Sequence, residues 1–431
     1  MAGSPPHGRR VAGRASRSLA RFGAFVAVAM LACGGSRAPA RADSIADREG
    51  MLGRVGVPDD LRPKIHRAID TGAVWLARHV EKDGTLRFDG PKRPFADDGV
   101  SALVTLAMAH ARTPAAFPAA RLATARLFGL SANGRVDGPG RLGAGTYQTY
   151  VCGILGLLAA DADLAVPRVR AAELAALFER GQDHDSGWWG YALTSSGGQI
   201  SRLRAGPAAP AAIPTVLNLS TTQFAALGAR AVGVAGAPVA LDLWRRHADG
   251  LCATQTDDGS WTYGLSRAAT SGYPNGTYMG LASLVLAEAA LAGRVEDAPL
   301  LKRVAVARLK GIAALRRDVD AQLGALRPAK GGFAPPLDGY SLYALEKACV
   351  FAGVEQVAGG SWYVRLAEAV VARQDEDGSW GRDPIQTSFL VLFLARSPER
   401  SAPVTTVTDP PRPARPAAPT TPSEPSTPTP R

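Results

Sequence analysis

The sequence predicts an all-α protein, an α6/α6 toroid in which an outer ring of six helices surrounds an inner ring of six. Helices that are apolar on one side alternate with helices that are apolar on nearly all sides, and a Gln–Gly–Trp motif recurs after the one-sided helices. No segment has the alternating pattern of a strand. The inner helices are expected near residues 99–111, 146–160, 221–234, 277–292, 339–353 and 386–396, and the outer helices near 61–80, 118–130, 168–181, 239–253, 299–316 and 361–373.

The two kinds of helix differ in where their apolar residues lie. Before Gln255, apolar residues such as Leu243 and Leu251 recur at helical spacing, with Asp242 and Arg245 on the opposite side. The segment 277–291 is apolar nearly all round, but it is too short to span a membrane. We therefore expect other parts of the protein to cover it on every side.

The repeated motif has the form Gln-x3-Gly-x-Trp. It is complete at 255–261 and 374–380, looser at 182–188, where one residue is inserted, and degenerate at 81–86. Gly can adopt the left-handed conformation that ends a helix, and the Gln side chain can reach backbone groups of the adjoining turn while the Trp covers its stem. We therefore expect structural clamps formed by Gln182, Gly187, Trp188, Gln255, Gly259, Trp261, Gln374, Gly378 and Trp380.

The carboxylates of the two complete motifs also allow a calcium site. These residues are Asp257, Asp258, Asp375 and Asp377. A calcium loop of the EF-hand type needs a bidentate Glu farther along, which neither copy supplies. We therefore interpret the Asp residues as caps of backbone amides, and we predict neither a metal nor a cofactor.

Both ends of the chain lie outside the predicted toroid, which occupies residues 61–397. Residues 1–42 combine early Arg residues, an apolar run and an Ala-Arg-Ala site, which is the order of a cleaved secretory signal. The alternative is a lipoprotein in which Cys33 is lipidated at the membrane. Residues 43–60 are expected to be a linker, and residues 398–431, with eleven Pro, a disordered tail. We expect export to the periplasm, the envelope or the extracellular space.

The net charge of +11 first suggests a nucleic-acid partner. Residues 1–42 hold seven of the 49 basic residues and no acid, so 42 basic residues stand against 38 acidic ones in the mature chain. Since the mature chain is nearly neutral and has no block of basic residues, we exclude nucleic acid as a partner. Beyond the leader, Cys152, Cys252 and Cys349 are far apart, which indicates buried thiols more than a disulfide framework.

The Gln-x3-Gly-x-Trp repeats resemble the QW motifs of squalene–hopene cyclases, oxidosqualene cyclases and prenyltransferase β-subunits, over most of residues 60–397. The segments 218–225, 338–346, 360–363 and 374–396 are similar more narrowly to exported bacterial prenyltransferase/squalene oxidase repeat proteins. The resemblance implies a toroid with a central cavity.

Two departures from these families bear on activity. Class II cyclases protonate an alkene with the central Asp of D-x-D-D, whereas residues 97–98 lack the upstream Asp and the Asp-x-Asp pairs at 161–163 and 318–320 lack the downstream ones. Prenyltransferase β-subunits bind zinc through Asp, Cys and His, and no His accompanies Cys152 or Cys349 on its helix. We therefore expect neither terpene cyclase nor protein prenyltransferase activity.

Inner helices that begin at one rim would gather their early polar residues there. The loop 187–217, with Trp188, Trp189 and Tyr191, is expected near the same edge. Such residues can hold a glycan or an apolar small molecule, and they can equally cap and pack helices. Catalytic residues are unknown, with His184 and Glu346 as lone acid–base candidates. The expected rim residues are Asp97, Asp98, Tyr147, Gln148, Tyr150, Gln223, Asn275, Tyr278, Asp338, Tyr340, Tyr343, Glu346 and Gln386.

Three functions stay open at this point. We favour an exported protein that binds a ligand or an envelope protein in or over its central cavity without turnover. A glycan-active lyase or hydrolase is the first alternative, and it would need a compact acid–base pair in the cavity. A divergent terpenoid-processing enzyme is the second, and it would need a deep cavity lined by aromatic residues.

The leader generates a prediction about processing. The mature protein should begin at Asp43, because the charged start, the short apolar run and the Ala-Arg-Ala site agree. N-terminal sequencing of protein from the envelope fraction checks this. An uncleaved leader would contradict it, and a lipidated Cys33 would establish the membrane-anchored alternative.

Overall fold

The computed structural model describes residues 45–88, 97–143, 147–193, 217–265, 269–326 and 337–396. Within these residues the protein is mostly helical, which confirms the all-α class. The predicted leader and the Pro-rich tail lie outside the described residues. In the part that the structure describes, no helix combines the length and the apolar character needed to cross a membrane.

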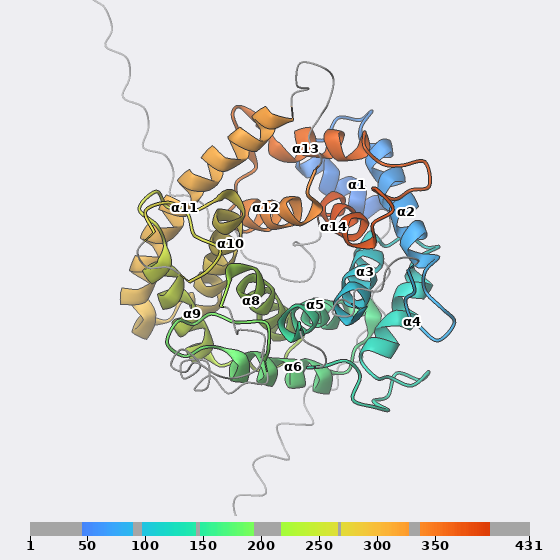
Figure 1. Cartoon of the computed structure of the whole chain (residues 1–431), viewed down its shortest axis with the longest axis horizontal. Coiled ribbons are helices and arrows are strands. Elements are labelled where there is room, and N and C mark those ends of the chain that lie inside the picture. The colour runs from blue at the N-terminus through green and yellow to red at the C-terminus, as the bar shows by residue number, and fades with distance from the viewer. Residues whose placement is uncertain are drawn as a thin grey trace, which may run out of the picture. The chain divides into compact units, whose positions relative to one another are not determined.

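Figure 1 shows central helices surrounded by others that pack outside them. The central helices contact one another in chain order, and the last returns to the first, so their contacts form a closed circuit. The central helices are α3 (Asp97–Ala111), α5 (Gln148–Ala160), α8 (Leu219–Val234), α10 (Pro274–Leu291), α12 (Gly339–Phe351) and α14 (Pro384–Leu394). The outer helices are α2 (Arg62–Ala77), α4 (Phe117–Leu127), α6 (Arg168–Gly181), α9 (Leu241–Thr254), α11 (Ala298–Ala325) and α13 (Trp362–Val371), with short 3-10 helices η1 (Ala162–Leu164) and η3 (Val295–Asp297).

The central helices are covered on every side, as their apolar sequences predict. Every residue of α10 from Gly276 to Ala287 is buried. Glycines allow α5 and α8 to pack closely: a Cβ on Gly153 would lie 2.4 Å from the carbonyl oxygen of Phe224, and one on Gly156 would lie 2.8 Å from the Cα of Gly228. Such contacts exclude larger side chains at this helix pair.

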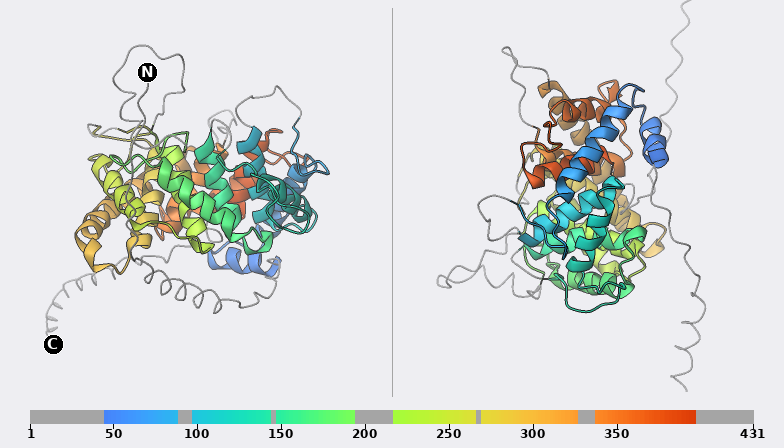
Figure 2. Two further views of the ribbon diagram at one scale, coloured as in Figure 1. Left: turned by 90° about the horizontal axis from the view of Figure 1, so that it is seen from below. Right: turned by 90° about the vertical axis from the view of Figure 1, so that its right-hand side faces the viewer.

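Three local features differ from the sequence predictions. The expected linker 43–60 contains a helix, α1 (Ile45–Arg54), which lies on one face of the other helices in Figure 2. Its apolar face is too short to give a periodic signal, although Leu52 is fully buried. Helix α11 continues to Ala325, beyond the expected end at 316. Strands β1 (Gln356–Val357) and β2 (Gly360–Ser361) form an antiparallel hairpin, although no strand was expected.

The motif after α13 joins this helix to α2. The Gln374 Nε2 donates one hydrogen bond to the carbonyl oxygen of Gly378 in its own turn (2.8 Å) and another to the carbonyl oxygen of Ala68 in α2 (2.9 Å). Gly378 has φ +93°, and a Cβ there would lie 2.6 Å from the carbonyl oxygen of Thr71. Only Gly fits both the conformation and the space, so the turn can lie directly on α2.

The two other Gln-containing motifs repeat these contacts. Each Gln donates one hydrogen bond to the Gly carbonyl of its own turn and another to a carbonyl of the next outer helix. The Gln after α6 thus reaches α9, and the Gln after α9 reaches α11. The distances are 3.1 Å to Gly187 and 3.0 Å to Leu243 for Gln182, and 3.0 Å to Gly259 and 2.8 Å to Ala307 for Gln255. The glutamine amides therefore connect consecutive outer helices.

The indole of each motif bonds back to the helix that precedes it. Trp380 Nε1 donates to the carbonyl oxygen of Val370 (2.9 Å), and Trp261 Nε1 donates in the same way to Leu251 (3.0 Å). In the first copy this position belongs to Trp189, which donates to the carbonyl oxygen of Phe178 (2.8 Å), and not to the predicted Trp188. The inserted residue lies before Gly187, so the indole still follows the glycine by two positions.

Each indole packs against one residue of the neighbouring outer helix. That residue lies four positions after the one whose carbonyl accepts the hydrogen bond from the Gln side chain. A Cβ on Gly72 would lie 3.1 Å from the Trp380 ring, and a Cβ on Gly311 would lie 3.1 Å from the Trp261 ring. At the equivalent position in α9, His247 packs edge-on against Trp189 with 5.2 Å between ring centroids. Two copies therefore leave room for the indole with Gly, and the third uses a buried His.

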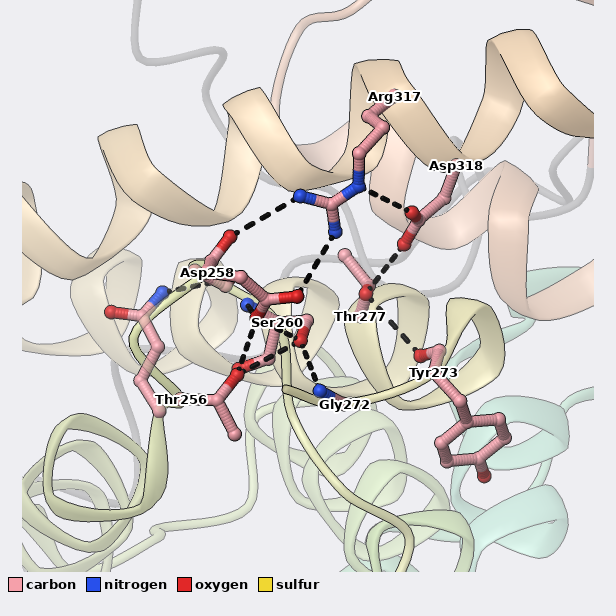
Figure 3. Close-up of polar contacts among 10 residues, drawn as sticks. Thr256, Asp258, Ser260, Gly272, Tyr273, Thr277, Arg317 and Asp318 are labelled. Atoms are coloured by element: carbon pink, nitrogen blue, oxygen red, sulfur yellow. Dashed lines mark hydrogen bonds and ion pairs between the residues drawn. The ribbon is translucent and has the colours of Figure 1, made fainter. Parts of the chain in front are cut away.

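Polar side chains also tie the middle motif to its neighbours (Figure 3). Asp258 accepts hydrogen bonds from the backbone amide of Ser260 (3.1 Å) and the hydroxyl of Thr256 (2.7 Å). On α11, Arg317 lies 3.5 Å from Asp258 and 3.1 Å from Asp318, which accepts from Thr277 of α10 at 2.7 Å. Asp258 therefore acts as a cap and an ion-pair partner, while Asp318 joins α11 to α10.

The clamp geometry predicts coupled losses of stability. Trp380→Ala should lower the free energy of unfolding by about 3–5 kcal/mol because it empties a packed aromatic site. Gln374→Ala should lower it by about 1–3 kcal/mol because backbone carbonyls lose their donor. The double variant should lose less than the sum, since both residues serve one clamp. Urea unfolding measures all three, and additive losses would contradict the clamp.

A matched control comes from the same turn. Asp377 accepts the backbone amide of Ser379 (2.9 Å), so Asp377→Ala should cost only about 1 kcal/mol, as a lost cap. Added calcium should leave the melting temperature unchanged. A large calcium-dependent rise would instead support the metal interpretation of these carboxylates.

The buried His247 predicts a loss of stability in mild acid. Burial lowers the pKa of His247 to about 4, although its bond to the carbonyl oxygen of Gly187 (3.0 Å) acts in the opposite direction. The folded state thus binds fewer protons than the unfolded state between about pH 6.5 and pH 4. As the pH falls through this window, the free energy of unfolding should decrease by about 3 kcal/mol from this group.

Unfolding measured between pH 7 and pH 4.5 in wild type and His247→Gln checks this. The variant should show a shallower pH slope, while His184→Gln, which changes an exposed His near the same clamp, should keep the wild-type slope. The slope should not vanish, because burial also lowers the pKa of His110. An unchanged slope in His247→Gln would contradict the assignment.

Candidate functional site

Several predicted rim residues cap or join the starts of central helices. Asp338 caps α12 by accepting the backbone amides of Tyr340 (3.3 Å) and Ser341 (3.2 Å). Gln386 at the start of α14 accepts the backbone amide of Gly339 (2.9 Å). Both side chains are therefore used to begin α12.

The other predicted amides have similar structural partners. Gln148 accepts the backbone amide of Leu193 (2.9 Å), and Asn275 donates to the Ser341 hydroxyl (2.8 Å). Gln223 differs, because it is fully buried and neither atom of its amide has a partner among the described groups.

The predicted acids and Tyr278 do not form a catalytic group together. Asp98 pairs with Arg141 (3.1 Å), and the side chain of Asp97 lies outside the described residues. Tyr278 points away from the centre, since its hydroxyl donates to Gln322 of α11 (3.1 Å). Its predicted place at the rim is therefore wrong, because its position on α10 faces the outer layer.

Four tyrosines form a continuous line across the starts of α5, α8 and α10. We call Tyr147, Tyr191, Tyr263 and Tyr273 the tyrosine row. The rings of Tyr147 and Tyr191 are 5.3 Å apart, the hydroxyls of Tyr191 and Tyr263 are 3.4 Å apart, and the rings of Tyr263 and Tyr273 are 6.5 Å apart. Tyr147 is 37% exposed and Tyr263 is 42% exposed, so solvent reaches the row.

Backbone bonds to the central helices hold the middle of the row in place. The amide of Thr149, in the first turn of α5, donates to the carbonyl oxygen of Tyr191 (3.1 Å). The amide of Leu219, which begins α8, donates in the same way to Tyr263 (2.8 Å). These amides lack partners within their own helices, so the row tyrosines complete the helix starts.

Behind the row, hydroxyl groups form a chain across the interior. The hydroxyl of Tyr150 donates to Ser220 of α8 (2.8 Å), and the Ser220 hydroxyl bonds in turn to that of Tyr340 on α12. The ring of Tyr150 lies 6.0 Å from that of Tyr191, which joins the chain to the row. Because α10 separates α8 from α12 in the circuit, the chain links helices that are not neighbours.

Tyr150, Tyr263, Tyr273 and Tyr340 stay protonated over the physiological pH range. Burial raises the pKa of Tyr273 to about 12, and burial also raises the pKa of Tyr150, Tyr263 and Tyr340. The groups that act on the Tyr150 hydroxyl are other tyrosines and Ser220, which are uncharged at neutral pH. The site therefore offers neutral hydroxyls that can both donate and accept.

A buried ion pair lies farther along α12. Lys347 Nζ is 3.7 Å from the Glu346 carboxylate and 3.7 Å from the centre of the Tyr343 ring. Burial lowers the pKa of Lys347 to about 7, although the neighbouring Glu346 acts to raise it. Glu346, the predicted acid–base candidate, thus lies against Lys347, and His184 is exposed at the surface.

The remaining acidic pairs also have structural partners. Arg112 binds Asp161 (2.8 Å) and Asp163 (2.7 Å) in a largely buried cluster. In the described residues, no group of three His, Cys, Asp or Glu side chains is placed to hold a metal ion. Cys152, Cys252 and Cys349 are free thiols.

Sequence reasoning named Tyr147, Tyr150, Tyr191 and Tyr340 but missed Tyr263 and Tyr273. A signal for Tyr263 was present, because it follows the indole Trp261 by two positions, as Tyr191 follows Trp189. Lys347 gave no comparable signal, since a single Lys in an apolar helix does not reveal its burial.

No family model matches the chain, and no curated protein sequence matches it. Among solved structures, it is similar to the type II terpene cyclase MstE from Scytonema in its apo form, with 16% identity, a TM-score of 0.44, and coverage of 78% of this chain and 98% of that one. It is also similar to a protein from Actinoplanes, with 18% identity, a TM-score of 0.40, and coverage of 77% and 99%.

Proposed function

We propose that this chain is an exported α6/α6 toroid of the terpenoid cyclase type that binds a ligand at the tyrosine row and does not convert it. The tyrosine row carries the proposal. Tyr150 and Tyr340 lie directly behind it, so six of the nine tyrosines of the chain gather at one end of the central helices. A concentration of partly exposed aromatic hydroxyls is typical of a binding surface.

The architecture behind the proposal rests on the repeat contacts. The closed circuit of central helices and the glutamine clamps between outer helices are what a toroid of this type requires. The leader supports export, and the Pro-rich tail would serve as a spacer at the envelope.

The absence of turnover is argued from the candidate acids. A class II cyclase needs a carboxylic acid that is free to protonate an alkene, and this sequence has no D-x-D-D motif. Asp98 is paired with Arg141, Asp338 caps a helix, and Glu346 faces Lys347. Each of these three carboxylates therefore already has a partner, either a basic side chain or the amides of a helix start.

A turnover assay tests the catalytic side of this proposal. Wild-type protein incubated with squalene or with geranylgeranyl diphosphate should give no cyclised or transferred product, because the sequence has no D-x-D-D motif and the described residues offer no zinc site. Gas chromatography with mass spectrometry would detect products. Turnover that disappears in Asp97→Asn or Asp98→Asn would contradict the proposal.

Native mass spectrometry tests the binding side. Protein purified from its own envelope fraction should retain a small molecule, and the double variant Tyr147→Ser/Tyr263→Ser should lose it. The control Val306→Ser/Leu309→Ser removes two exposed apolar side chains of α11 and should retain the molecule. Retention by the row variant, or no bound molecule in any form, would count against the tyrosine row as the binding site.

A further inference from the structure

We infer that the ligand of the tyrosine row is a neutral glycan chain, an inference that rests on the binding function proposed above. The row presents aromatic faces and hydroxyl groups together. A pyranose has the complementary surface, with apolar C–H faces that stack on aromatic rings and hydroxyls around its edge. A purely apolar terpenoid would displace water from the row hydroxyls without offering them new hydrogen bonds, which carries a penalty for desolvated polar groups.

The electrostatics of the row select an uncharged ligand. Within the described residues, the hydroxyls of Tyr150, Tyr263 and Tyr340 are influenced by one another, by neighbouring tyrosines and by Ser220. Recognition of an acidic sugar or a phosphate usually uses Arg or Lys. Among the described residues, Arg141, which precedes α5, is paired with Asp98.

The length of the row selects a chain over a single sugar. Tyr147 stands at the start of α5 and Tyr273 at the start of α10, with Tyr191 and Tyr263 between them. Successive sugars of one chain can contact successive rings, so each added unit binds at a high effective concentration. Affinity should therefore rise with chain length until the row is filled.

The row is also preorganised. The backbone bonds from Thr149 to Tyr191 and from Leu219 to Tyr263 fix the two central tyrosines before any ligand arrives. Neighbouring rings restrict Tyr147 and Tyr273 further. Little conformational entropy is then lost on binding, which suits a ligand whose single contacts are weak.

Isothermal titration calorimetry with defined oligosaccharides tests the inference. The neutral probes are cellohexaose and chitohexaose with their disaccharides, and the acidic probe is hexagalacturonate. At least one neutral hexasaccharide should bind about tenfold more tightly than its disaccharide and than the acidic probe. Raising NaCl from about 50 mM to about 500 mM should change the affinity less than twofold, since no ion pair forms.

Matched variants locate the binding. Tyr147→Ala and Tyr263→Ala should each weaken hexasaccharide binding about tenfold, because each removes a stacking ring. Tyr263→Phe keeps the ring and should weaken it only about two- to threefold, through the hydroxyl alone. The control Val306→Ser/Leu309→Ser should bind as wild type, and unchanged melting temperatures would show that every variant is folded.

The outcomes separate the two proposals. Tighter binding of hexagalacturonate that salt suppresses would overturn the neutral class. A peptide of residues 409–430 that binds the row while the neutral hexasaccharides do not would overturn the glycan in favour of a Pro-rich ligand. If the sugars fail but the Tyr147→Ser/Tyr263→Ser variant loses its co-purifying molecule, the glycan inference is wrong and the binding function stands. If both experiments fail, both proposals are wrong.

Discussion

The bond from each clamp glutamine to a carbonyl of another outer helix is the interaction on which the rest of the structure depends. A single amide nitrogen satisfies its own turn and the neighbouring helix together, as Gln374 does with Gly378 and Ala68. The left-handed glycine brings the turn close enough for this bond, and the indole packs on the same neighbouring helix one turn farther along. Packing of apolar faces alone would leave the rotation of one helix pair against the next poorly determined. The paired hydrogen bonds set it.

The same clamps determine where the tyrosines appear. Once an indole is anchored to the preceding helix, the chain leaves the clamp in a defined direction toward the start of a central helix. Tyr191 and Tyr263 both follow the indole by two residues, and both bond through their carbonyl oxygens to a first-turn amide. The candidate binding surface is thus an extension of the repeat and not a separate insertion.

The helices and the clamps were largely predictable, because both leave periodic or repeated signals along the chain. The assignment of Trp188 was wrong because it omits the single residue that separates the glycine from the indole in both complete copies. Helix α1 and the end of α11 were missed because short or weakly patterned helices depend on tertiary packing for their stability. The tyrosine row brings together residues from positions 147 to 273, and only the arrangement of the helices in space makes them neighbours. The same holds for the burial of Lys347 and Gln223.

The contact between Gln374 and α2 joins residues 306 positions apart. Helix α2 is among the first parts of the fold to be synthesised, and its partners α13 and α14 are the last. Until those helices emerge, α2 can pack against α3, but the part of its apolar side that contacts α13 and α14 stays uncovered and the circuit is open at both ends. Closing the circuit therefore requires contact between segments that are far apart in the sequence, which is a slow step in folding. Until it happens, the exposed apolar surface of the open ends is prone to aggregation. An exported chain of this design would benefit from staying unfolded, or bound by a chaperone, until its final repeat is available.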